Sequence, residues 1–138
     1  MRQRLATARV ACLATIGTGV SGLAPQLVPI CFAVEGDVIY SAVDEKPKRS
    51  RQLRRLSNIS ANPLVCVLAQ NYSELWDQLW WVRADGAART LPSPVDEEHA
   101  QAVRLLRGKY PQYSAHRLDG PVVAIDVIRW AGWKSTVD

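Results

Sequence analysis

The sequence predicts an α+β fold built on a small antiparallel β-barrel of six strands, with two or three helices inserted between the strands. First, the length of 138 residues, 48% of them hydrophobic and 22% charged, suits one soluble globular domain spanning residues 1–138. Second, apolar segments rich in β-branched residues are separated by glycine and proline turns. Third, the expected order is strand-strand-strand-helix-strand-strand-helix-strand. This order lacks the regular alternation of βαβ units.

The first part of the chain predicts three strands joined by turns. Pro25 and Pro29 cannot donate hydrogen bonds to a ladder, so the second strand should lie at an edge, contain a bulge or run beside a ligand. Glycines at 17, 19 and 22 suit the first turn, and Gly36-Asp37 suits the second. The three expected strands comprise residues 10–16, 23–35 and 38–43.

The second part of the chain predicts two helices and three strands. Asn62-Pro63 should end the first helix. The strand at 64–72 is almost wholly apolar, so both of its faces should be covered. Asp85-Gly86 marks a turn or bulge, Ser93 suits the N-cap of the second helix, and His99 should be a solvated helix residue. The expected helices comprise residues 47–61 and 94–110, and the strands comprise 64–72, 79–91 and 122–128.

The cysteines and the apolar segments indicate the cellular compartment of the protein. Cys12, Cys31 and Cys66 each lie in an apolar, strand-like setting, so we expect three reduced core thiols in a cytoplasmic protein. No metal site is predicted, because neither of the two histidines shows ligand spacing to a cysteine. Residues 10–34 carry no charge, but their glycines and prolines favour two strands over a membrane span or signal peptide.

The segment 46–55, KPKRSRQLRR, is the strongest indication of function. Six of its ten residues are cationic, although the whole chain carries a net charge of only +4. The run opens the first predicted helix, where the macrodipole disfavours positive charge. Exposed backbone N–H groups at a helix start suit a phosphate, so an anionic ligand is expected there. From charge alone, a phosphorylated cofactor, nucleic acid and anionic lipid all remain possible partners.

The sequence matches common catalytic motifs poorly. Ser114, His116 and Asp119 lie too close together in one loop to form a hydrolase triad, and G-x-S-x-G is missing from the sequence. The glycine-rich segment GTGVSG lacks the ending of a phosphate-binding P-loop. The acidic residues at 96–98 are expected to compensate a helix dipole, not to form a glycosidase pair.

Tryptophan makes up half of the aromatic residues. Trp80 and Trp81 are adjacent on a predicted strand and should point to opposite faces. One can enter the core while the other meets a ligand or a second subunit. Trp133, followed by Lys134, could cover a planar ligand and reach an anion.

Three segments carry a resemblance to a known family: PQLVPI at 25–30, VIYSAV with the basic run through residue 65, and LWWVRADGAAR at 79–89. With the C-terminal WAGWKS, they resemble the pyridoxamine 5′-phosphate oxidase-like split-barrel proteins. The similarity points to the actinobacterial branch that uses the deazaflavin coenzyme F420. This resemblance implies a six-stranded split barrel and a homodimer with two cofactor sites at the subunit interface.

The resemblance also implies which residues bind the cofactor. One strand would line the ring, the end of the next strand and the following cations would hold the phosphate, and tryptophans of the partner subunit would complete the site. In this sequence the implied residues are Pro25, Gln26, Leu27, Val28, Pro29, Tyr40, Ser41, Lys46, Lys48, Arg49, Arg54, Trp81, Trp133 and Lys134.

The implied activity is hydride transfer between coenzyme F420 and a small organic acceptor. FMN is the alternative cofactor, but six cations suit the phosphodiester and polyglutamate tail of coenzyme F420 better than the single phosphate of FMN. A non-catalytic cofactor carrier is a second hypothesis, because no residue of the sequence demands acid–base work. Nucleic acid is not expected as a partner, because no nucleic-acid-reading motif is recognisable. A membrane is not expected either, because residues 10–34 favour two strands over a membrane span.

Overall fold

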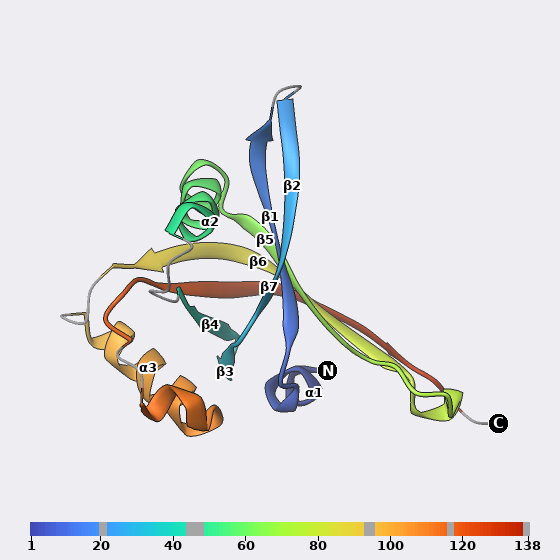
Figure 1. The fold of residues 1–138 in the computed structure, drawn as a ribbon. Helices are drawn as coiled ribbons and strands as arrows, with labels where there is room; N and C mark the ends of the chain where they lie inside the picture. Colours follow the sequence, from blue (N-terminus) through green and yellow to red (C-terminus); the bar gives the residue numbers. More distant parts are fainter. Residues whose placement is uncertain (20–21, 44–48, 93–95, 116–117, 137–138) are drawn as a thin grey trace.

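A computed structural model of the protein describes residues 1–19, 22–43, 49–92, 96–115 and 118–136, with only the backbone of residues 19 and 49–53 (Figure 1). Three α-helices and seven strands make up the described part, which confirms the predicted α+β class. The helices are α1 (Arg2–Thr7), α2 (Arg49–Ala61) and α3 (Glu97–Lys109), with short 3₁₀ turns η1 (Trp76–Gln78) and η2 (Pro111–Ser114). The strands are β1 (Ala11–Gly19), β2 (Gly22–Ile30), β3 (Ala33–Glu35), β4 (Val38–Ala42), β5 (Leu64–Asn71), β6 (Trp80–Leu91) and β7 (Val122–Lys134).

All seven strands form one antiparallel sheet in the order β2-β1-β5-β6-β7-β4-β3. The edge strands β2 and β3 are consecutive in the chain and are joined only by Cys31 and Phe32. A link of two residues spans only about 10 Å. The two edges must therefore approach each other, so the sheet curls into a barrel.

The expected six-strand count is wrong, because the segment predicted as one strand over 23–35 is two strands. The break is stabilised by side chains from distant elements. The Phe32 backbone N–H donates to the Tyr110 hydroxyl at 3.1 Å, and the Ser41 hydroxyl donates to the Cys31 carbonyl at 2.9 Å. These two bonds satisfy backbone groups that leave the ladder. Phe32 itself is fully buried in the core.

Both prolines of β2 lie where the sequence predicts. Pro25 pairs with Ile16, and Pro29 pairs with Cys12, across the β1–β2 ladder. In the described sheet β1 is the sole neighbour of β2, so the predicted edge position is confirmed. An edge strand tolerates proline because one row of its backbone groups has no ladder partner.

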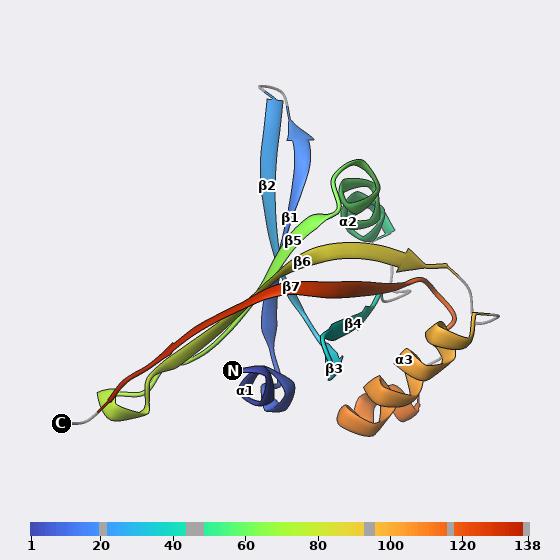
Figure 2. The same ribbon diagram turned by 180° about the vertical axis from the view of Figure 1, so that it is seen from behind.

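The last strand is longer than predicted. It was expected to end at residue 128, but β7 continues to Lys134 and pairs with β6 along its whole length. The register shifts between Asp85 and Gly86, which confirms the predicted bulge. Together β5, β6 and β7 extend beyond the barrel as a long arm, opposite the end that carries α2 and α3 (Figures 1 and 2).

Helix α3 differs from expectation at two positions. Its N-cap is Asp96, whose carboxylate accepts from the Glu98 N–H at 2.8 Å; the predicted cap, Ser93, lies outside the described residues. His99 was expected to be solvated but is 1% exposed, with Nε2 2.8 Å from the Gly120 carbonyl oxygen. It faces inward because the helix packs on β3 and β4. No helix among the described residues has the length and apolar character needed to cross a membrane.

Two hydrophobic cores stabilise the protomer. The first fills the barrel with residues such as Leu13, Ile39 and Val67, and Leu5 of α1 is buried in it. The second lies under α3 and contains Leu106 and Val122. These cores place α2 against β1 and α3 against β4.

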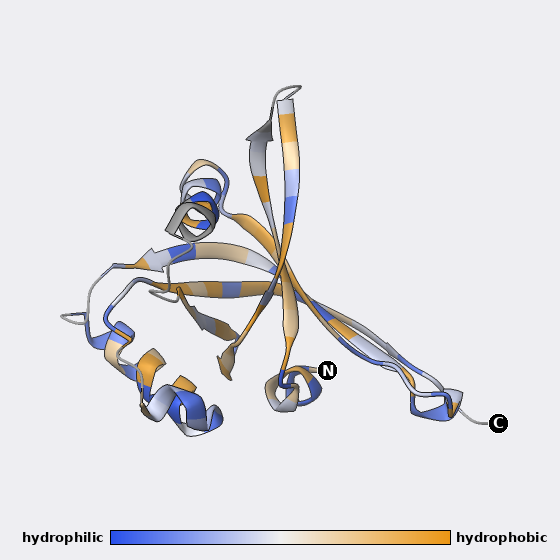
Figure 3. Ribbon diagram, viewed as in Figure 1, coloured by the Kyte–Doolittle hydropathy of each residue, from blue (hydrophilic) through white to orange (hydrophobic). Residues whose placement is uncertain are grey.

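One surface of the sheet has no covering element within the described part of the chain. Alternate residues of β1 and β5 point into the core, while those between them are half-buried or exposed. The prediction that both faces of 64–72 are covered is therefore wrong. Apolar residues (orange) run along β2 and β5 (Figure 3). We call this surface the open face, which includes Ala14, Pro25, Leu27, Pro29, Leu64, Leu68, Trp81, Asp85, Ile128, Arg129 and Trp133.

The cysteines were also expected in the core, and this expectation is wrong. Cys12 and Cys66 are half-buried on the open face, and Cys31 is exposed at the β2–β3 break. Each alternates with core residues along the chain, so an apolar sequence context alone does not assign its face.

Lys109 is an unusual buried cation. Its ammonium nitrogen lies 3.8 Å from the centre of the Phe32 ring and has no hydrogen-bond partner among the described residues. Burial and the nearby Arg9 lower the pKa of Lys109 from 10.5 to about 8. Above pH 8 the folded protein loses this proton while the unfolded chain keeps it until about pH 10.5. Stability conferred by this group therefore rises with pH across that window.

Replacing Lys109 with methionine is expected to remove the increase of stability with pH. At pH 7 it should also raise the free energy of unfolding by roughly 1 kcal/mol, because it removes a buried charge that solvent screens only in part. Urea denaturation of both proteins at several pH values measures the difference. Lys134→Met, which changes an exposed lysine, is the control and should show little change. An unchanged pH dependence in Lys109→Met would contradict the assignment.

Candidate functional site

Two cavities lie along the sheet. The first, of about 480 Å³, is lined by Ala14, Thr15, Ile16, Pro25, Leu64, Val65, Cys66, Asp85, Gly86, Ile128 and Arg129. The second, of about 400 Å³, lies where α1 meets the arm and is lined by Met1, Arg4, Trp81, Val82, Gly132, Trp133 and Lys134. Both volumes are typical of small-molecule sites.

The first cavity is apolar with one charged end. There Asp85 accepts from Arg83 at 2.8 Å and from Arg129 at 3.0 Å. Burial alone would raise the pKa of Asp85, but the hydrogen bonds from both arginines lower it. Burial, followed by the charge of Asp85, raises the pKa of the Cys66 thiol. At neutral pH the cavity therefore presents the Asp85 carboxylate, the Arg129 guanidinium and a protonated thiol, while Arg83 pairs with Asp85 from beside the cavity.

The side chains of the predicted ring-binding segment, residues 25–29 of β2, alternate between the two faces of the sheet. Pro25 lines the first cavity, and Leu27 and Pro29 are exposed on the open face. Gln26 and Val28 point to the opposite side. Gln26 Oε1 accepts from Asn58 Nδ2 at 3.2 Å, and the same amide donates to the buried Thr15 hydroxyl at 3.1 Å. Gln26 therefore fixes α2 against β1 and β2.

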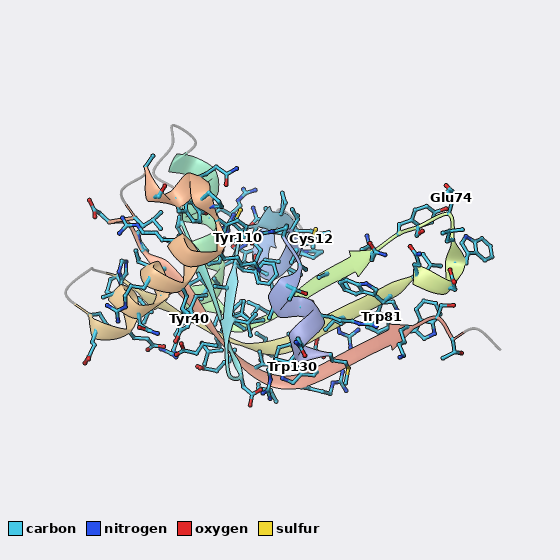
Figure 4. The ribbon with its side chains drawn as sticks, turned by 90° about the horizontal axis from the view of Figure 1, so that it is seen from below. Cys12, Tyr40, Glu74, Trp81, Tyr110 and Trp130 are labelled. Atoms are coloured by element: carbon cyan, nitrogen blue, oxygen red, sulfur yellow. The ribbon has the colours of Figure 1, made fainter. Side chains whose placement is uncertain are left out.

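Tyr40 and Ser41 lie apart from both cavities. The Tyr40 hydroxyl donates to Glu98 at 2.9 Å, and Arg89 holds the same carboxylate at 2.6 and 2.8 Å. Burial and this hydrogen bond raise the pKa of Tyr40 to about 12. Ser41 is 1% exposed and donates to Cys31, as described above. In the protomer these hydroxyls stabilise the barrel closure and the core beneath α3. Figure 4 shows Tyr40 on the side of the molecule that carries α3.

Only part of the basic run can be placed. Lys46 and Lys48 lie outside the described residues, and Arg49 opens α2 with only its backbone described. Arg54 is exposed on α2. Arg55 is half-buried, burial lowers its pKa, and its Nε has no hydrogen-bond partner within the described part of the chain. The helix follows β4 directly in the chain and packs on β1.

The predicted tryptophan pair does come together. Trp81 and Trp133 face each other across the β6–β7 ladder, and both line the second cavity with Lys134. Trp80 points the other way and packs against the first core, where the Arg4 guanidinium lies 5.7 Å from its ring centre. This arrangement confirms the prediction that Trp80 and Trp81 take opposite faces.

Sequence reasoning missed the charged cluster of Arg83, Asp85 and Arg129. Arg83 and Asp85 are two residues apart on a strand, so they share a face, and this spacing was a usable signal. Arg129 joins them only because β7 is longer than expected. Within the described residues, no group of three or more histidine, cysteine, aspartate or glutamate side chains is arranged to hold a metal.

Comparisons with known proteins agree on the fold. The family described as pyridoxamine 5′-phosphate oxidase matches residues 1–134. A search of curated proteins gave no match. A FAD-binding protein from Mesorhizobium loti is 20% identical, with 94% of this chain and 87% of that chain covered and a TM-score of 0.67.

Two mycobacterial structures are also similar. A conserved protein from Mycobacterium tuberculosis is 20% identical, with coverage of 96% and 81% and a TM-score of 0.73. The FAD binding protein from Mycobacterium smegmatis is 19% identical, with coverage of 95% and 88% and a TM-score of 0.59. At these identities the structures establish the fold, and the sequence match establishes the family. The chain therefore belongs to the pyridoxamine 5′-phosphate oxidase family.

Proposed function

We propose that this protein is an oxidoreductase that binds a flavin-type cofactor and transfers hydride between it and a small organic acceptor. The observation that carries the proposal is the open face, on which an apolar cavity beside Pro25 shares one sheet with the Trp81–Trp133 pair. Coenzyme F420 is the cofactor we favour. FMN is the second candidate, supported by the family and by the FAD-binding proteins of the same fold.

The described residues fit such a cofactor. A planar ring needs a flat apolar surface, and Pro25, Leu27 and Pro29 provide one along an edge strand. An anionic tail needs cations, which α2 offers at the exposed Arg54 and the arm offers at Lys134. The cofactor, when bound, supplies the hydride chemistry itself. The chain's residues would bind it, orient it and exclude water.

The cluster of Arg83, Asp85 and Arg129 limits the chemistry that the first cavity can support. Asp85 remains ionised beside Arg83 and Arg129, so it would fix the two guanidinium groups in place without donating a proton. Those guanidinium groups would attract the anionic or carbonyl oxygen of an electrophilic acceptor. Because Asp85 stays ionised and burial makes the Cys66 thiol a weaker acid than usual, a non-catalytic cofactor carrier is the alternative function.

The proposed working unit is a homodimer in which two open faces meet. Leu27, Leu64 and Ile128 are each more than half exposed, which is costly for an isolated soluble protomer. A two-fold arrangement would bury these side chains and bring the arm of one copy to the β2 edge of the other. We further propose that this dimer is cytoplasmic and works without nucleic acid or membrane.

Thiol labelling is expected to report the dimer. Cys12 and Cys66 lie on the open face and should become protected as the protein concentration rises, whereas the exposed Cys31 should react at a constant rate. Mass spectrometry of a maleimide time course at several dilutions resolves the three sites, and sedimentation gives the mass at each dilution. Equal labelling of Cys66 in monomer and dimer would place the interface elsewhere.

The proposed activity is tested by titrating the purified protein with coenzyme F420 and with FMN while following ring fluorescence. We expect saturable binding of coenzyme F420, and slow oxidation of its reduced form by a panel of conjugated acceptors. Micromolar binding of FMN alone would reverse the choice of cofactor. Tight binding without turnover of any acceptor would favour the carrier function.

A further inference from the structure

The loop at the end of the arm is held in a defined conformation by hydrogen bonds. Residues 72–79 connect β5 to β6 through η1 and carry their own hydrogen bonds. Asn71 Nδ2 donates to the Gln78 carbonyl at 2.9 Å, and the Leu75 N–H donates to the Ser73 hydroxyl at 3.1 Å. The Ser135 N–H donates to the Leu79 carbonyl at 2.9 Å, which ties the end of β7 to the same loop. This loop therefore has a defined surface, which we call the arm tip.

The arm tip displays large apolar side chains to solvent. Tyr72, Leu75 and Trp76 are 69%, 62% and 69% exposed. Given the size of aromatic side chains, they present roughly 400 Å² in one short segment. A patch of this size on an ordered loop is typical of an interaction surface, and tryptophan and tyrosine are common anchors of such surfaces.

The charge of the arm tip indicates its partner. Glu74 and Asp77 flank the apolar residues, and none of the ion pairs among the described residues involves either of them. Glu74 lies at the far end of the arm (Figure 4). An acidic, apolar surface fits a basic one. Helix α2 offers the exposed Arg54, and its first residues are the last part of the basic segment 46–55 of the sequence.

The arm tip cannot reach α2 of its own protomer. The two lie at opposite ends of the molecule, with the barrel strands between them (Figures 1 and 2). Only a second copy can bring them together. A two-fold axis would form this contact twice, with each arm tip on the other copy's helix.

We propose that the arm tip docks on α2 of a second copy of this chain, with Tyr72, Leu75 and Trp76 packed against the helix and Glu74 and Asp77 facing its cations. The proposal rests on the proposed homodimer and adds a second contact beyond the open face. It also gives the arm a purpose, because an isolated three-stranded extension buries little apolar surface of its own.

The test compares arm-tip variants with matched controls by sedimentation across a dilution series. Leu75→Ser with Trp76→Ser should raise the dimer dissociation constant by about 10-fold or more, as loss of anchor residues does. Val10→Ser removes an exposed apolar side chain outside the arm tip and should change it by less than about 2-fold. Glu74→Lys with Asp77→Lys should also weaken the dimer, and adding Arg54→Glu should restore part of the loss. Glu97→Lys reverses an acidic residue of α3, outside the arm tip, and controls for the change in net charge.

Each outcome separates the hypotheses. A wild-type protein that is monomeric at all concentrations contradicts the homodimer itself. A wild-type dimer that is insensitive to the arm-tip changes overturns only the docking proposal. Sedimentation with vesicles of phosphatidylglycerol and phosphatidylcholine tests the competing occupant: vesicle binding lost in Leu75→Ser with Trp76→Ser, with an unchanged dimer, would assign the arm tip to a membrane surface.

Discussion

Replacing Gly86 with alanine is expected to lower the free energy of unfolding by about 3 kcal/mol. Gly86 lies at the register shift between β6 and β7, where Ile128 of β7 has no partner on β6. An added Cβ would collide with the Asp126 backbone carbonyl oxygen and lie 3.0 Å from Ile125 Cγ2. Backbone cannot move aside as a flexible side chain can, so the ladder or the bulge must distort. Urea denaturation monitored by tryptophan fluorescence measures the change.

Gly108 provides the matched control for Gly86. It lies near the end of α3, and an added Cβ there meets nothing within 4 Å. Alanine at this helical position should stabilise the protein by about 0.5 kcal/mol, because glycine loses more backbone freedom on folding. If both variants were equally stable, the tight approach of β6 and β7 at the first cavity would be wrong.

Removing two cations from the basic run is expected to weaken cofactor binding by at least 10-fold. The variant combines Lys48→Ala with Arg49→Ala, and each lost charge-assisted hydrogen bond to a phosphate is worth about 1.5 kcal/mol or more. Fluorescence titration measures the dissociation constant, and circular dichroism checks that the fold is intact.

A control with the same charge change distinguishes a binding site from a general field. Arg104→Ala with Arg107→Ala removes two exposed arginines from α3, outside both cavities. This control should bind within about 2-fold of the wild type, because exposed charges beyond a Debye length are screened at physiological salt. Equal losses in both variants would show that the basic run acts only through net charge.

Local patterns predicted most elements of the fold. Asn62-Pro63 ends α2 as expected, and Pro25 and Pro29 correctly marked an edge strand, because these effects depend on the residue itself. The break at Cys31–Phe32 was missed because it depends on Tyr110, which lies 78 residues further along the chain. His99 was misjudged for a similar reason, since its burial depends on how α3 packs.

Strand pairing brings together some of the residues that the sequence nominated for the candidate site, which itself stays a prediction. Trp81 and Trp133 lie opposite each other, since antiparallel pairing of two recognisable strands brings them into register, and both line the second cavity with Lys134. Tyr40 and Ser41 could not be placed from sequence, because their hydroxyls bond with Glu98 and Cys31, which belong to other elements. Arg83, Asp85 and Arg129 form a cluster that depends on the unexpected length of β7.

Mixing two defective variants tests most directly whether one cofactor site draws on two protomers, as the proposed homodimer requires. One variant carries Lys48→Ala with Arg49→Ala, and the other carries Trp133→Ala with Lys134→Ala. After the variants are mixed and allowed to exchange subunits, half of the dimers should be hybrids with one intact site each, so about a quarter of all sites should recover wild-type affinity for coenzyme F420 or FMN. Recovery to that level is the predicted result. Two variants that each bind poorly alone and show no recovery in a mixture with demonstrated subunit exchange would contradict a shared site.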